Sequence, residues 1–165
     1  MEHLSEFSIP REALEKLKDP LFVKNQVAEG KTFQEILGFS LATMDKFYGA
    51  AHNLYTRQQY EEAADAFVFL TTLNPRVHTY WVGLGMSEQL NEEYDAALMA
   101  YSMAILINVE NPLPHYHSAA CYFALQEKDN AILSLEMALQ HAETKEEYAH
   151  IKKHAQSTLD SLKKQ

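Results

Sequence analysis

Three alanines of the chain, Ala63, Ala97 and Ala131, are separated by 34 residues each. The same interval relates three large residues that follow these alanines by four positions: Phe67, Tyr101 and Leu135. It also relates three small residues that precede the alanines by twelve positions: Ala51, Gly85 and Ala119. A fixed spacing at several positions indicates an internal repeat, in which each unit packs against its neighbours.

The middle copy indicates the type of repeat. Trp81, Leu84 and Gly85 follow the order W-x₂-L-G, which opens the tetratricopeptide repeat, a helix-turn-helix unit of this length. The small residues of such a unit lie where its two helices cross, because only small side chains let the backbones approach closely. We therefore expect an all-α fold, with three tetratricopeptide repeats in a short right-handed helical solenoid, N-terminal helices before it and a C-terminal capping helix after it.

The repeat register divides the chain into three parts. Residues 41–143 carry the repeats, with helices expected at 41–57, 60–73, 77–90, 93–108, 113–126 and 129–142. Residues 1–40 lie outside the register, and their helical patterns are too short to be stable alone, so they must pack on the repeats or on another chain. Thr32 and Glu35 there predict a capping box. Residues 144–165 form the expected capping helix, since a repeat array needs a last element with one polar face.

Composition and charge exclude several classes of partner. The formal net charge is −9, from 14 basic and 23 acidic residues, and phosphate binding depends on clustered Lys and Arg, so we expect no nucleic acid partner. The longest apolar stretch, residues 96–109, is interrupted by polar residues and too short to span a bilayer. No secretory signal pattern follows Met1. We expect no stable membrane insertion and a cytoplasmic location.

The sequence offers no catalytic or metal-binding constellation. Cys121 lies within an apolar helix pattern, where a core role is expected rather than a nucleophile. His150 and His154 share one helix face, but a metal site needs further ligands. Gly83 and Gly85 also lie inside a helix pattern, where they serve packing rather than phosphate binding. We expect no enzyme activity, no cofactor and no metal.

The first helices of such repeats line the concave side of the array. Counting from the repeat register, we expect nine side chains in this groove: Tyr48, His52, Tyr55, Val82, Met86, Gln89, Tyr116, Ala120 and Phe123. Aromatic and methionine side chains offer apolar contact area with polar tips, which suits an extended peptide. The alternative is that some of them, above all Tyr55 and Phe123, are buried between helices.

Several motifs resemble one family more specifically. Residues 81–102 resemble the second repeat of the SycD/LcrH-type chaperones of bacterial type III secretion. The resemblance lies in the run from Trp81 to Gly85 with Gln89, in Tyr94-Asp95-x-Ala97 and in Tyr101-Ser102. The third repeat of that family is resembled by Asn111-Pro112, Tyr116-His117, Ala119 and Cys121. Its first repeat is resembled by Tyr48, Tyr55 and Tyr60-Glu61-x-Ala63. The likeness spans about residues 30–142. Glu88 departs from the pattern, because a tetratricopeptide repeat usually has tyrosine there.

This resemblance implies a class II chaperone, which holds hydrophobic translocator proteins in the bacterial cytoplasm before export. It implies that a short, proline-containing segment near the translocator N-terminus lies extended in the groove, with Tyr48, Tyr55 and Phe67 as its first contacts. It also implies a homodimer through the N-terminal helices, here residues 7–28. The alternative is a generic tetratricopeptide adaptor for another protein. Adaptors that clamp a peptide carboxylate need basic groove residues, and the three groove helices offer only Lys46 and Arg57.

Overall fold

The structure, a computed structural model, describes residues 11–164. Within that range the chain forms ten α-helices and one 3-10 helix, with no strand, so the all-α prediction is confirmed. The first residues of the predicted dimerisation segment, 7–10, lie outside the described residues, as do the outer ends of the predicted segments 1–40 and 144–165.

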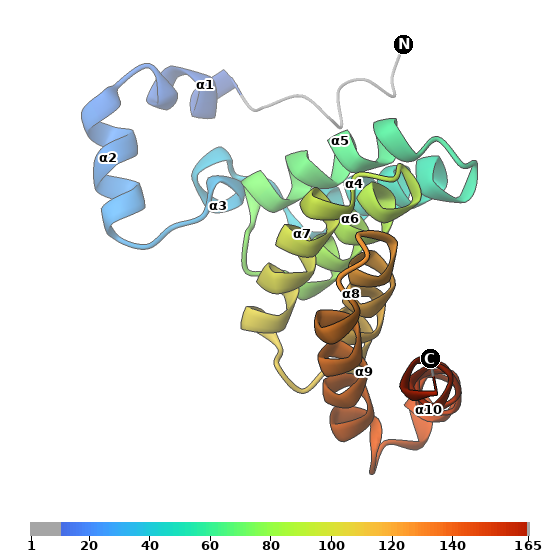
Figure 1. The fold of residues 1–165 in the computed structure, drawn as a ribbon. Coiled ribbons are helices and arrows are strands. Elements are labelled where there is room, and N and C mark those ends of the chain that lie inside the picture. Colours follow the sequence, from blue (N-terminus) through green and yellow to red (C-terminus); the bar gives the residue numbers. More distant parts are fainter. Residues whose placement is uncertain (1–10, 165) are drawn as a thin grey trace.

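Six of the helices form three successive hairpins (Figure 1). The hairpins pair α4 (Leu41–Thr56) with α5 (Tyr60–Leu73), α6 (His78–Leu90) with α7 (Tyr94–Ile107), and α8 (Pro112–Ala124) with α9 (Lys128–Ala142). Every boundary lies within two residues of the expected one. Each hairpin turn contains one non-glycine residue with left-handed backbone, Gln58, Glu92 or Gln126, with φ of 61°, 64° and 63°. The turns therefore repeat at the same 34-residue interval as the helices.

Small side chains occupy the helix crossings, as predicted. Ala63 and Ala97 are 0% exposed and Ala131 is 1% exposed. A Cβ atom on Gly85 would lie 2.5 Å from Cε1 of Tyr101, and one on Gly83 would lie 2.3 Å from Cε1 of Phe67. These two glycines therefore make room for aromatic rings of the second helices, which confirms their packing role.

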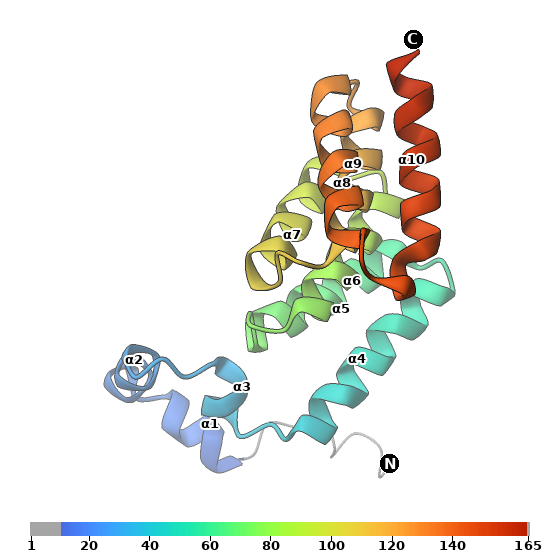
Figure 2. The same ribbon diagram turned by 90° about the horizontal axis from the view of Figure 1, so that it is seen from below.

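The last helix, α10 (Ala149–Lys163), follows the 3-10 helix η2 (Glu146–Tyr148) and lies beside α8 and α9 (Figure 2). Four apolar residues of α10 recur at intervals of three or four and are buried on one face: Ile151, Ala155, Leu159 and Leu162. Leu159 and Leu162 pack with Leu135 of α9 in one apolar cluster. The remaining face of α10 is polar and exposed, as expected of a helix that ends a repeat array.

Three short helices precede the hairpins: α1 (Arg11–Leu17), α2 (Pro20–Ala28) and α3 (Phe33–Leu37). The predicted capping box begins α3, because the Thr32 amide donates to Oε2 of Glu35 at 2.7 Å and the Glu35 amide donates to the Thr32 hydroxyl at 3.3 Å. The Thr32 amide and the Thr32 hydroxyl, which both donate to Oε2 of Glu35, lower the pKa of its carboxyl. The capping box fixes the start of α3, and Ser40 caps the start of α4 in the first hairpin.

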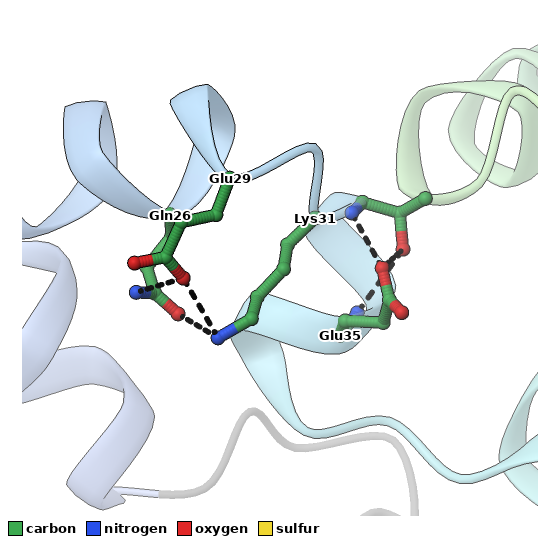
Figure 3. Close-up of polar contacts among 5 residues, drawn as sticks. Gln26, Glu29, Lys31 and Glu35 are labelled. Atoms are coloured by element: carbon green, nitrogen blue, oxygen red, sulfur yellow. Dashed lines mark hydrogen bonds and ion pairs between the residues drawn. The ribbon is translucent and has the colours of Figure 1, made fainter.

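Polar contacts connect these helices to one another and to the body. The Lys31 ammonium donates to Oε1 of Gln26 at 2.6 Å and lies 3.3 Å from Oε2 of Glu29 (Figure 3). Asn74, which follows α5, donates to Oε1 of Gln34 in α3 at 2.8 Å. Helices α1 and α2 extend away from the hairpins in both views (Figures 1 and 2). Much of their surface is therefore left open.

Candidate functional site

A first pocket, of about 290 Å³, lies between α4 and α6. Six of the residues singled out from the sequence line it: Tyr48, His52, Tyr55, Phe67, Val82 and Met86. The three residues from α4 recur at intervals of four and three, which places them on one face of that helix. The structure thus brings side chains from two successive hairpins into one hollow.

Aromatic rings make one wall of this pocket rigid. The centroid of the Tyr48 ring lies 5.9 Å from that of Phe67 and 6.0 Å from that of Tyr80, on which it stacks. Phe67 is 2% exposed and Tyr80 is 7% exposed, so Tyr48 rests on a buried support. Burial raises the pKa of Tyr55, and the Tyr60 phenol adds to the effect. The hydroxyl of Tyr55 therefore stays protonated near neutral pH and can donate a hydrogen bond.

His78, at the start of α6, adds a polar group to the lining of the first pocket. Its Nε2 atom is buried and has no hydrogen-bond partner within the described residues. Burial lowers the pKa of the imidazole, which favours the neutral form. A neutral imidazole offers one donor and one acceptor, and a buried group without a partner carries a free-energy cost that a ligand can relieve.

A second pocket, of about 400 Å³, lies between α8 and α10. Four further residues singled out from the sequence line it: Gln89, Tyr116, Ala120 and Phe123. Phe123 is 59% exposed, so it is not buried between helices. Tyr55 of the first pocket is half-buried. The nine residues expected in the groove and Phe67, a contact implied by the family resemblance, therefore all line one of the two pockets.

Tyr101 of α7 contacts two lining residues of the second pocket, Gln89 and His117. Its hydroxyl donates to Oε1 of Gln89 at 2.8 Å, and its ring stacks on that of His117 with centroids 5.7 Å apart and planes 14° apart. Tyr101 is 0% exposed, and burial raises the pKa of its phenol. Gln89 and His117 are thus held in place by one buried residue of α7.

Other lining residues were missed by the sequence analysis. In the first pocket these are His78, Thr79, Gly83, Asn111 and Leu113, and in the second they are His117, Ala119, Leu135, Thr158 and Leu162. Asn111 and Leu113 come from the start of the next hairpin, and Thr158 and Leu162 come from α10. The missed residues of α6 and α8 lie in first helices, where three groove positions per repeat were too few. Leu135 of α9 and the two residues of α10 lie outside first helices, where the repeat period assigns no groove position.

Residues considered for other chemistry lie elsewhere. Cys121 is 0% exposed, and burial raises the pKa of its thiol to about 11, which confirms it as a core residue. His150 and His154 are exposed on α10. In residues 11–164 no three His, Cys, Asp or Glu side chains are grouped so that they could hold a metal ion. None of the helices described is both long and apolar enough to cross a bilayer.

Known proteins resemble this chain in sequence and in fold, although no family model matches it. Low calcium response locus protein H of Yersinia pestis is 27% identical over 134 residues, which are 81% of this chain and 80% of that protein. A chain of the CopN–Scc3 complex is 30% identical, with a TM-score of 0.75 over 78% of this chain and 75% of that chain.

The type III secretion chaperone SycD of Yersinia enterocolitica has been solved in complex with a peptide of the translocator YopD. It is 27% identical to this chain, with a TM-score of 0.73 over 75% of this chain and 95% of that chain. SycD has also been solved as an alternative dimer.

Proposed function

Since the chain belongs to the SycD/LcrH-type family of type III secretion chaperones, we propose that it binds hydrophobic translocator proteins and keeps them soluble before export. The observation that carries this proposal is that the nine residues expected in the groove, together with Phe67, line two pockets. The complex of SycD with a translocator peptide supports the same kind of client. We propose a bacterial cytoplasmic location, where such a client is synthesised.

The occupant that we propose is a short, extended, proline-containing segment near the N-terminus of the translocator. Pockets of about 290 and 400 Å³ suit separate apolar side chains rather than a folded domain. In the first pocket, Tyr48, Tyr55 and Phe67 provide flat apolar contact with little loss of side-chain freedom. His78 and the Tyr55 hydroxyl can bond the peptide backbone, whose polar groups need partners once they are buried.

The alternative, an adaptor that clamps a peptide C-terminus, fits the pockets less well. Neither pocket has a Lys or Arg among its lining residues, and capture of a terminal carboxylate depends on such groups or on backbone amides. The lining is aromatic and aliphatic with a few neutral polar groups. That composition favours an internal apolar segment over a charged chain end.

We also propose a homodimer formed through the N-terminal helices. Leu14 of α1 and Leu21 and Val27 of α2 are 43%, 63% and 50% exposed, and a second copy would cover this apolar surface. The alternative dimer solved for SycD supports a dimeric state. Light scattering on the full chain and on a version without residues 1–28 tests this proposal. A dimer that becomes a monomer on truncation is expected, and a monomeric full chain at tens of micromolar would contradict it.

The chaperone function is tested by co-expression with the hydrophobic translocator encoded beside its gene. We expect a soluble complex that co-purifies, because the client's apolar segments need a partner before export. A translocator without its N-terminal region should lose the complex, whereas one shortened at its C-terminus should keep it. A client that is equally soluble with and without this chain would overturn the proposal.

A further inference from the structure

A third hollow, of about 910 Å³, runs along α6 and α7 to the turn between α8 and α9. It shares no lining residue with the two pockets described above. On α6 it is lined by Trp81, Leu84 and Glu88, which recur at intervals of three and four and so share one helix face. The α6 residues of the two pockets lie on a different face, so this hollow is a separate surface.

The floor of the hollow is apolar and partly open to solvent. Leu98, Met99 and Met103 of α7 line it together with Trp81, and Met99 is 73% exposed. Methionine side chains are flexible and polarisable, which lets such a surface adapt to a bound apolar face. Exposed apolar groups gathered in one concave place are typical of a protein interaction site.

The rim of the hollow is acidic. Glu88, Asp95 and Glu127 line it, and none of its twelve lining residues is Lys or Arg. No ion pair within residues 11–164 involves these three carboxylates. Burial raises the pKa of Glu88, and the nearby Glu93 and Asp65 carboxylates add to the effect. Within the described residues, no Lys or Arg forms an ion pair with these rim carboxylates, in a chain whose net charge is already −9.

We propose that this hollow binds an amphipathic helix of a second protein, one whose apolar row is flanked by Lys and Arg. Its volume of about 910 Å³, against about 290 Å³ for the first pocket, suits a helix face laid lengthwise rather than single side chains. Basic residues beside the apolar row would balance the acidic rim. Because the site is separate from the two pockets, the helix binds while the client segment is in place.

Glu88 distinguishes this surface from that of a typical tetratricopeptide repeat. It stands at the position where a tetratricopeptide repeat usually has tyrosine, and a tyrosine there would fill part of the hollow with an uncharged ring. The carboxylate instead leaves space above Leu84 and brings charge to the edge of the apolar floor. Glu88 thus adds to the acidic rim that Asp95 and Glu127 also form.

The test uses the full chain and a synthetic helical peptide of about 14 residues, long enough to form an amphipathic helix, with Leu at helical spacing, Lys elsewhere and no tryptophan. Trp81 is the single tryptophan of the chain and lines the hollow, so its emission reports binding there. We expect a saturable change. The double variant Glu88→Gln, Asp95→Asn should bind roughly tenfold more weakly, because rim charges contribute modestly, whereas the control Glu61→Gln, Glu62→Gln on α5 should bind as the unaltered chain does.

Two further peptides and one variant separate this proposal from others. A peptide with Glu in place of Lys, and one with the same residues in a scrambled order, should both bind weakly. Equal binding of the scrambled peptide, or equal affinity of the rim variant, would overturn the proposal. Tyr48→Ala should leave binding unchanged, and a loss of binding there would assign the peptide to the client pockets instead. Circular dichroism checks that each variant keeps its helical content.

Discussion

The first and second pockets, which we propose hold the client, are built differently. The first takes its lining residues from α4, α5, α6 and the start of the third hairpin, all within the repeats. The second also needs Thr158 and Leu162 of α10, which follows the repeats. A repeat period specifies where groove side chains lie, but a wall made by a helix outside the repeats depends on how that helix packs. The two pockets therefore respond to different substitutions.

The pockets also differ in how firmly their aromatic side chains are held. Tyr48 in the first pocket stacks on Tyr80 and contacts Phe67 edge to face, and both supports are buried. Phe123 in the second pocket is 59% exposed. A fixed side chain loses less entropy when a ligand binds, so we expect the first pocket to contribute more to client affinity.

The largest expected effect concerns the wall of the second pocket. Leu159 of α10 is 5% exposed and packs in the cluster that joins α10 to α8 and α9. Leu159→Ala should lower the free energy of unfolding by ~2–5 kcal/mol, because it removes buried methyl groups and leaves a cavity. Urea unfolding measures this, with the exposed Lys153→Ala on the same helix as control. Equal stability of the two variants would mean that α10 does not close the second pocket.

A substitution in the middle hairpin tests the packing on which both pockets depend. Ala97 is 0% exposed where α6 and α7 cross. Ala97→Leu should destabilise the protein by ~1–3 kcal/mol through overpacking, whereas Ala50→Leu at an exposed site on α4 should change stability little. Thermal unfolding compares the two variants. An unchanged melting temperature for Ala97→Leu would show that the crossing is not where the period places it.

The weaker role of the second pocket can be measured directly. Phe123→Ala should reduce client affinity by ~1 kcal/mol, less than loss of an aromatic anchor at the centre of an interface. Leu133 of α9 is 57% exposed and lines neither pocket, so Leu133→Ala is a matched control that should keep full affinity. A titration in which Phe123→Ala costs more than a substitution in the first pocket would reverse the order proposed here.

Acidification should weaken the second pocket through His117. Burial lowers the pKa of His117, so an unfolded chain, with a histidine pKa near 6.5, binds a proton that the folded chain does not. The contribution of neutral His117 to the stability of the fold is therefore fully present above about pH 6.5, and it is lost as the pH falls below that value. His117→Phe keeps a ring beside Tyr101 and cannot titrate. Between pH 7.5 and 5.5 its melting temperature should fall less than that of the unaltered chain, and an equal fall would contradict this assignment.

The sequence predicts the parts of the molecule that repeat. Ala63 and Ala97, with the W-x₂-L-G motif, locate the helices to within two residues and place the groove side chains, because a fixed period transfers geometry from one hairpin to the next. The position of α10 has no such period. Its apolar face is visible in the sequence, but which helices that face packs against depends on the path of residues 143–148, so Thr158 and Leu162 could not be assigned to a pocket.

The hollow along α6 and α7 shows the same limit. Glu88 is recognisable in the sequence as a departure from the repeat pattern, yet its meaning depends on Asp95, in the first turn of α7, and on Glu127, in the turn between α8 and α9. Only the packed structure brings these carboxylates to one rim.

The central claim is that the first pocket provides the main anchors for the client. Calorimetric titration with a proline-containing peptide from the N-terminal region of the co-encoded translocator tests it most directly. The double variant Tyr48→Ala, Tyr55→Ala should bind the peptide more weakly by ~2 kcal/mol or more for each anchor removed, and its helical content should stay unchanged. The control variant Tyr148→Ala, which lies outside both pockets, should bind with full affinity. Equal affinities of the double variant and the unaltered chain, with both folded, would contradict the account.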